Sequence, residues 1–295
     1  MSASSVSIAA LLACYDRREK TLRCLERLFS AADEVPHAKV RTFLLDDASP
    51  DGTGQAVSET YPDVVVLQGT GNLFWNRGMH RAMTTAMREG FDFYLWLNDD
   101  TLIEKSTLKS MIDTAEWVRS RGGSDGIIVG STEARSGSGI TTYGGRKRVS
   151  VFRPLRSDLV APASKPISCD TMNGNCVLIP SSVVKAIGPL DPVFHHSMGD
   201  MDYGFRARKA GFGIWVMPGF AGVCGKNLRE GAWMDPEVPL LERLRNLTAS
   251  KGLPLWPWAV YAFRHGGLLG LVVWAWTYVN LFRTSILHWA RREGR

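Results

Sequence analysis

The chain has 295 residues, a net charge of +6 and a mixed composition, which excludes a disordered tract or a small disulfide-stapled domain. The excess positive charge lies in residues 236–295, where eight basic residues accompany three acidic ones. Because the rest of the chain is nearly neutral, the composition predicts no nucleic-acid partner. The five cysteines show no paired metal spacing and are expected to be reduced thiols, as in a cytoplasmic protein.

Four apolar runs in the first hundred residues predict strands, at Val6–Cys14 and at residues 40–45, 64–68 and 91–97. No basic region precedes the first run, so a strand is expected there rather than a signal peptide. Helix patterns lie between and after these strands, around residues 22–29, 54–60, 79–88 and 102–118. Alternating strands and helices at this spacing predict a doubly wound α/β layer.

Polar loops follow three successive strands. The second strand ends in Asp46-Asp47-Ala48-Ser49-Pro50-Asp51-Gly52-Thr53, the third leads to Gly71-Asn72, and the fourth ends in Asn98-Asp99-Asp100. Ligands of open α/β sheets bind beyond the carboxyl ends of the strands. Two adjacent carboxylates there favour a divalent cation carried by a diphosphate. The alternative interpretation is a solvated turn in which an aspartate caps the next helix.

Two common nucleotide-binding signatures are missing. The first strand is followed by Cys14-Tyr15-Asp16-Arg17 and not by the Gly-x-Gly-x-x-Gly turn of dinucleotide-binding dehydrogenases. No Gly-x-x-x-x-Gly-Lys-Ser/Thr phosphate loop occurs in the sequence either. The pattern therefore favours a nucleotide held through carboxylates and a metal.

A fourth motif, Gly199-Asp200-Met201-Asp202, opens a late helix. With these four motifs in this order, the chain from Val6 to about residue 227 resembles the family 2 glycosyltransferases. These are inverting enzymes of the GT-A fold, whose Rossmann-like mixed sheet carries helices on both faces, and they use nucleotide-sugar donors. The resemblance is greatest to the rhamnosyltransferase-like subgroup that makes bacterial surface polysaccharides.

The resemblance implies a role for each donor-side residue. Asp47 would accept a hydrogen bond from the imide N–H of uracil or thymine, with Ala13 and Tyr15 beside the base. Asp99 would touch the ribose or the metal shell, and Asp100 would bind Mg²⁺ or Mn²⁺ on the diphosphate. Further donor contacts are expected from Asn72 and Arg77. Many relatives place a histidine after the last strand as a further metal ligand. Here Cys224 would fill that place, or the metal would have no protein ligand there, and Lys226 could contact the diphosphate instead.

On the acceptor side, the resemblance makes Asp200 the general base that takes the proton of the attacking hydroxyl. Relatives usually have Glu-Asp or Asp-Asp at this pair, whereas this chain has Gly199-Asp200. Asp202 would orient the base, although both aspartates could instead cap the helix. His195, His196 and Asn173 are further candidates for contact with the acceptor.

Residues 1–230 are predicted to form the catalytic domain, and residues 231–295 a basic, tryptophan-rich helical extension. Residues 266–282 form an uncharged run of 17 residues, at the lower limit for spanning a bilayer. Flanking tryptophan and arginine favour peripheral contact of residues 256–289 with the inner face of the cytoplasmic membrane. The alternative is that these helices pack on the catalytic domain or on a second subunit of a homodimer.

Together these features predict transfer of a sugar from a UDP- or dTDP-sugar, such as dTDP-rhamnose, to a glycan or lipid-linked acceptor. A sugar nucleotidyltransferase has a similar layered architecture but needs an amino-terminal glycine-rich, basic loop, which this sequence lacks. A non-catalytic glycan-binding protein is the other alternative, and the presence of both Asp100 and Asp200 argues against it.

Overall fold

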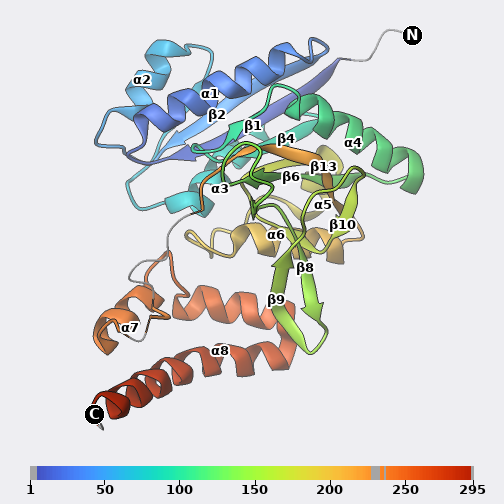
Figure 1. Cartoon of the computed structure of the whole chain (residues 1–295). Coiled ribbons are helices and arrows are strands. Elements are labelled where there is room, and N and C mark those ends of the chain that lie inside the picture. The colour runs from blue at the N-terminus through green and yellow to red at the C-terminus, as the bar shows by residue number, and fades with distance from the viewer. Residues whose placement is uncertain (1–4, 227–232, 236, 294–295) are drawn as a thin grey trace.

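The computed structural model describes residues 5–226, 233–235 and 237–293, the last six without their side chains (Figure 1). In this part of the chain a ten-stranded mixed sheet forms the centre, with its main path in the order β10-β13-β6-β12-β4-β1-β2-β3. Its strands are β1 (Val6–Cys14), β2 (Ala38–Asp46), β3 (Val65–Gln68), β4 (Phe93–Leu97), β5 (Leu102–Ile103), β6 (Gly126–Glu133), β7 (Thr141–Tyr143), β10 (Ile167–Cys169), β12 (Cys176–Pro180) and β13 (Gly213–Val223).

Strand β1 lies in the middle of the parallel half of the sheet. It pairs in parallel with β2 on one side and with β4 on the other, and most of its residues are buried. Such a strand is apolar along its whole length because helices cover both faces of a parallel sheet. The carboxyl ends of β1, β2 and β4 therefore meet at one edge, as the sequence predicts.

Six helices cover the two faces of this sheet (Figure 1). Helices α1 (Arg18–Asp33), α2 (Thr53–Thr60) and α4 (Thr107–Gly122) lie on one face, and α3 (Phe74–Ala86), α5 (Ser181–Ile187) and α6 (Gly199–Lys209) on the other. Each layer buries its own apolar cluster against the sheet. The predicted doubly wound α/β architecture is confirmed.

Two predicted helix starts were wrong. Helix α3 begins at Phe74 and not at about residue 79, because the Asp47 carboxylate accepts the N–H groups of Leu73 and Phe74 at its start. Helix α4 begins at Thr107 and not at residue 102, because Leu102–Ile103 pairs with β13. Both differences come from contacts between segments far apart in the sequence.

A small second sheet follows β7, where the sequence indicates a polar, basic loop. Strands β8 (Gly145–Ser150) and β9 (Arg153–Leu159) form an antiparallel hairpin, and β11 (Thr171–Met172) pairs with β8. The hairpin extends from the catalytic domain toward the C-terminal helices (Figure 1).

The C-terminal extension packs on the catalytic domain. It contains α7 (Leu240–Thr248) and α8 (Leu255–Glu293), and α8 is divided into two arms by a non-helical residue, Gly267. Trp258, Tyr261 and Ala262 of the first arm share a buried cluster with Phe205 of α6 and Phe194 before it. In the part of the chain that the structure describes, no helix combines the length and apolar character needed to cross a bilayer.

Candidate active site

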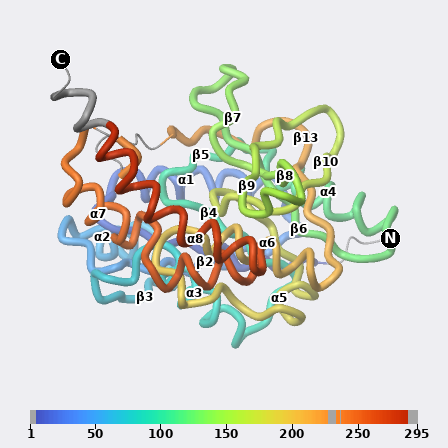
Figure 2. The backbone as a smooth tube through the Cα atoms, turned by 90° about the horizontal axis from the view of Figure 1, so that it is seen from below, coloured from blue at the N-terminus to red at the C-terminus, as the bar shows by residue number. Residues whose placement is uncertain are grey.

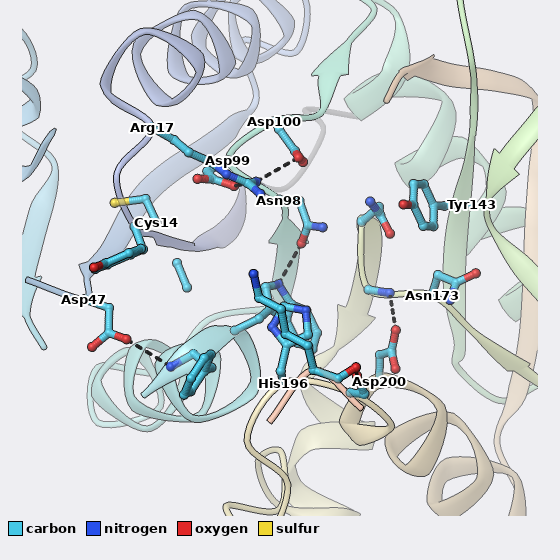
Figure 3. A pocket seen from close by; sticks show the side chains of 18 of the residues that line it. Cys14, Arg17, Asp47, Asn98, Asp99, Asp100, Tyr143, Asn173, His196 and Asp200 are labelled. Carbon is cyan, nitrogen blue, oxygen red and sulfur yellow. Dashed lines mark hydrogen bonds and ion pairs between the residues drawn. The ribbon is translucent and has the colours of Figure 1, made fainter. Parts of the chain in front are cut away.

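A cavity of about 580 Å³ lies at the carboxyl ends of β1, β2 and β4 (Figure 3). The loop before β12 and the start of α6 form its other side, and Lys251 of the extension contributes to its wall. Nine of the residues predicted from the sequence line this cavity: Ala13, Tyr15, Asp47, Asp99, Asp100, Asn173, His196, Asp200 and Cys224. The structure thus brings most of the predicted donor and acceptor residues together.

Five predicted contact residues do not line the cavity, and one of them, Lys226, lines a smaller neighbouring pocket with Asp100. Asn72 is exposed on the loop before α3, and the Arg77 guanidinium donates to the carbonyl of Pro192 at 2.9 Å. The His195 ring lies 3.4 Å from the Ser250 hydroxyl, and Asp202 is fully buried in the first turn of α6. Contact of these five residues with substrate stays a prediction.

Asp47 organises the loop between β3 and α3. Its carboxylate accepts four backbone N–H groups, from Thr70, Gly71, Leu73 and Phe74, at 2.8 to 3.1 Å. A carboxylate has about four acceptor positions, so these bonds use its capacity. Phe74 has a φ of 55°, an uncommon value for a residue with a side chain, and this tight turn brings it to the cavity wall. The predicted contact between Asp47 and a pyrimidine base would have to replace part of this network.

The Asp99 and Asp100 carboxylates form ion pairs with the same side chain, the guanidinium of Arg17. Arg17 Nη1 lies 3.1 Å from Asp99 Oδ1 and 2.8 Å from Asp100 Oδ2. Burial raises the pKa of Asp99 to about 7; the Arg17 guanidinium opposes this shift, and the charge of Asp100 adds to it. The second oxygen of Asp99, Oδ2, is buried with no hydrogen-bond partner among the described residues.

This arrangement fits a divalent cation. Two carboxylates converge on a position that a positive group already occupies, and one buried carboxylate oxygen is unpartnered, as an oxygen-ligated Mg²⁺ or Mn²⁺ site requires. Cys224 Sγ lies 3.6 Å from Asp100 Oδ1, and burial raises the pKa of this thiol to about 12, so without a metal the neutral thiol donates to that carboxylate. Within the described residues, no cluster of three or more histidine, cysteine or acidic side chains is placed to hold a metal.

Asp200 lies on the side of the cavity formed by α6 and the loop before β12, where Figure 3 shows its contact with the loop carrying Asn173. One of its oxygens accepts the N–H of Gly174 at 3.1 Å, and the other accepts the N–H of Met201 at 2.8 Å. Burial raises the pKa of this carboxyl above the usual value for aspartate, while the two backbone N–H groups oppose the shift. A carboxylate that is held in place and has a raised pKa is suited to accept a proton.

The structure explains why glycine precedes Asp200. A Cβ atom on residue 199 would lie 1.7 Å from Oδ1 of Asn76. Asn76 is fully buried and cannot move aside, because its amide donates to the carbonyls of Asp191 and Phe194. Residue 199 therefore has no room for a larger side chain, and Asp200 is the carboxylate of the Gly199-Asp200 pair.

Asp202 turns away from the cavity toward the extension. Its carboxylate contacts Arg206, Arg264 and His265, each at 2.8 Å. Burial alone would raise the pKa of Asp202, but these three partners outweigh it and lower the pKa. Two residues of α8 thus pair with a carboxylate in the first turn of the helix that carries Asp200.

Arg17, Trp75 and Lys251 are among the cavity residues that sequence reasoning missed. Arg17 follows β1 at the same edge as the acidic loops, so its position was a usable signal for an ion pair. The Trp75 indole donates to Asn98 Oδ1 at 2.7 Å and packs beneath Gly174. Lys251 reaches the cavity only because the extension folds back, and no local pattern predicts that.

Burial, with the charges of Lys251 and Arg17, lowers the pKa of His196 to about 4, so this predicted acceptor contact is neutral at pH 7.

Known proteins with similar sequences identify the class of enzyme. A family model described as glycosyltransferase-like family 2 matches residues 6–246. The chain belongs to this family. The predicted family and the prediction of a glycosyltransferase are thereby confirmed.

Two curated relatives, both from Mycobacterium tuberculosis strains, are N-acetylglucosaminyl-diphospho-decaprenol L-rhamnosyltransferases. Each is 24% identical over 210 residues, which cover 64% of this chain and 67% of the relative.

Solved structures of similar shape confirm the GT-A fold of this glycosyltransferase. One is the mannosyltransferase PcManGT from Pyrobaculum calidifontis in complex with GDP-Man and Mn²⁺, at 16% identity and a TM-score of 0.58, covering 97% of this chain and 75% of that one. Another is TarS 1-349 from S. aureus in complex with UDP-GlcNAc, at 15% identity and a TM-score of 0.51, covering 87% and 70%. At these identities the likeness supports the fold alone.

Proposed function

We propose that this family 2 glycosyltransferase transfers a deoxyhexose, with inversion, from a UDP- or dTDP-sugar to a lipid-linked saccharide. The observation that carries the proposal is the placement of carboxylates around one cavity. The Asp99–Asp100 pair lies at the end of β4, and Asp200 lies on the part of the wall formed by α6. The acceptor class is inferred from the printed name of the Mycobacterium tuberculosis relatives, whose acceptor is a lipid-linked N-acetylglucosamine.

The donor would occupy the side of the cavity formed by β1, β2 and β4. Its base would lie near Ala13 and Tyr15, and Asp47 would maintain the shape of the adjoining loop, reading the base only if its own hydrogen bonds rearrange. Asp99 and Asp100 would hold Mg²⁺ or Mn²⁺, and Arg17 would supply a positive charge beside them. When bound, the cation would offset the negative charge of the leaving diphosphate.

The reaction then requires one proton acceptor on the far side of the sugar. As the acceptor oxygen forms its bond to the anomeric carbon, its proton passes to Asp200, and the bond from that carbon to the diphosphate oxygen breaks. The N–H groups of Gly174 and Met201 hold the Asp200 carboxylate in position for this transfer. Neutral His196 and Asn173 line the same cavity and would orient the acceptor through hydrogen bonds.

Calorimetry provides a direct test. UDP and dTDP should bind in the presence of Mn²⁺ and bind much more weakly after chelation of the metal. A panel of nucleotide-sugars, followed by donor hydrolysis, should then identify the sugar. If neither nucleotide binds with the metal present, the donor class proposed here is wrong.

A further inference from the structure

The second arm of α8 has an unusual surface for a water-exposed helix. A row of apolar side chains at helical spacing is exposed along its outer side: Leu268, Val272, Trp276, Val279, Phe282 and Ile286. Leu268 is 79% exposed and Val272 is 65% exposed. A helix on the surface of a globular protein normally turns its apolar face inward. This arm packs Trp274, Tyr278 and Leu281 inward but also exposes this second apolar row to solvent.

Hydrogen bonds fix the inward side of the same arm against the protein. The buried Arg243 of α7 donates to Ser285 at 2.5 Å and to Thr284 at 3.0 Å. The Tyr278 hydroxyl donates to the carbonyl of Leu253, and the Trp258 indole donates to Thr277. These bonds determine the rotation of the helix about its axis, so the apolar side remains outward.

The tip of the β8–β9 hairpin is a second exposed apolar element. Val151 is 81% exposed and Phe152 is 83% exposed. The hairpin contacts the kink in α8 close to this tip, where Arg148 donates to the carbonyl of His265 and where Gly266 packs against Leu155. Figure 1 shows the hairpin reaching down to this kink, and Figure 2 shows α8 lying across the same side of the molecule. Large apolar patches on a monomer mark sites of interaction.

The positive charge of α8 and of the β8–β9 hairpin indicates which kind of partner these apolar side chains contact. No acidic residue occurs between Lys251 and Arg292, or between Ala134 and Ser157. Lys147, Arg153 and Arg156 are exposed on the hairpin, and the exposed Arg283 lies over the Trp276 ring at 5.7 Å. Two copies of so basic a surface would repel each other, whereas anionic lipid headgroups attract it. Tryptophan and arginine beside an apolar stripe are typical of helices that lie in the headgroup region.

We propose that the outer side of the second arm of α8 and the β8–β9 tip form one docking surface for a bilayer containing anionic phospholipid. The inference rests on the proposed function in one respect, because such docking would bring the cavity close to a lipid-linked acceptor. Lys251 precedes α8 and lines the cavity, so the docked extension is also part of the wall of the candidate active site.

Flotation of the full chain with vesicles tests this surface. The protein should bind phosphatidylcholine vesicles that contain phosphatidylglycerol, bind pure phosphatidylcholine more weakly, and lose part of the binding at high salt. The double variant Val151→Ser/Phe152→Ser should lower the partition coefficient about tenfold or more, since each side chain would otherwise be buried among the lipids. The double variant Val272→Gln/Val279→Gln, in the second arm of α8, should lower the partition coefficient to a similar extent.

Ile140→Ser is the matched control, because Ile140 is 62% exposed but lies outside both elements. It should bind vesicles as the unchanged protein does. All four altered side chains are exposed, and unchanged thermal unfolding should confirm that the variants fold. Equal binding by the two double variants and the control would overturn the proposal. So would a concentration-dependent dimer, in the absence of lipid, that the α8 variant abolishes.

Nucleotide calorimetry on the same samples separates this inference from the proposed function. Binding of UDP or dTDP with Mn²⁺ but no binding to anionic vesicles would contradict the docking surface alone. Binding to vesicles with no binding of either nucleotide would contradict the donor class alone. The double variants should bind nucleotide as the unchanged protein does, because none of the four residues lines the cavity.

Discussion

The two sides of the cavity use aspartate in different ways. On the side of β1, β2 and β4, Asp47 accepts four backbone N–H groups, and Asp99 and Asp100 share the positive charge of Arg17 while one buried oxygen of Asp99 has no partner among the described residues. On the opposite side, Asp200 is held by two backbone N–H groups, and burial raises its pKa. The first arrangement suits the binding of charge, and the second suits the uptake of a proton. The same residue type thus serves two tasks because its surroundings differ.

Replacing Asp200 should produce the largest effect. Asp200→Asn keeps the shape of the side chain but removes the proton acceptor, so the rate of sugar transfer should fall about 10²–10⁴-fold. The affinity for nucleotide, measured by calorimetry with Mn²⁺, should stay within about twofold, since the base acts on the acceptor. If the variant lost both nucleotide binding and sugar transfer, Asp200 would belong to the donor side. The difference between the two sides of the cavity would then not hold.

Gly199→Ala should disturb the position of Asp200 without changing its chemistry. The new methyl group would meet Asn76 Oδ1, and overpacking of this kind costs about 1–3 kcal/mol of stability. Chemical denaturation should measure this loss, and transfer should slow more than nucleotide binding weakens. The double variant Gly199→Ala/Asn76→Ala removes the clash and should recover part of the transfer rate. Full activity of the single variant would show that this contact is not tight.

On the side of the cavity formed by β1, β2 and β4, Asp100→Asn should weaken metal-dependent nucleotide binding about tenfold or more, because a carboxylate ligand of the metal would be lost. Nucleotide binding after chelation of the metal should change little. Asp113→Asn is a suitable control, because Asp113 pairs only with Lys109 on the exposed surface of α4 among the described contacts. Equal losses with and without metal would assign Asp100 to direct contact with the nucleotide.

The pH dependence should give the smallest but most discriminating difference. Burial raises the pKa of Asp200, so its carboxylate form is lost at a higher pH than for an ordinary aspartate, and transfer should fall as the pH drops through that raised value. Burial raises the pKa of Asp99 to about 7, so cation binding should weaken as the pH falls below about 7, by at most about tenfold per unit. Transfer rates at saturating nucleotide and Mn²⁺, beside calorimetric titrations at each pH, separate the two. If the pH profile of the transfer rate and the pH profile of nucleotide affinity coincided, a single titrating group would account for both.

The sequence predicted the parallel half of the sheet well because its strands are marked by long apolar runs and by polar loops at their ends. The same logic located Asp99 and Asp100 at one sheet edge, whereas Asp200, at a helix start, was singled out through the resemblance to family 2 glycosyltransferases. The start of α3 was missed because Asp47 caps it from another strand. Asp202 and Lys251 were misjudged or missed because their surroundings come from the extension, and a local pattern contains no information about that contact.

The ion network around Asp202 has a consequence for the order in which the protein is made. Arg264 follows Asp202 by 62 residues, and His265 follows it by 63. Synthesis proceeds from the amino terminus, so the helix that carries Asp200 emerges well before two of the three groups that balance its buried carboxylate. Until then Arg206, four residues along the same helix, is the one partner of the three that has been made. We expect α6 to gain the other two ion-pair and hydrogen-bond contacts of Asp202 late, after the first arm of α8 has been translated.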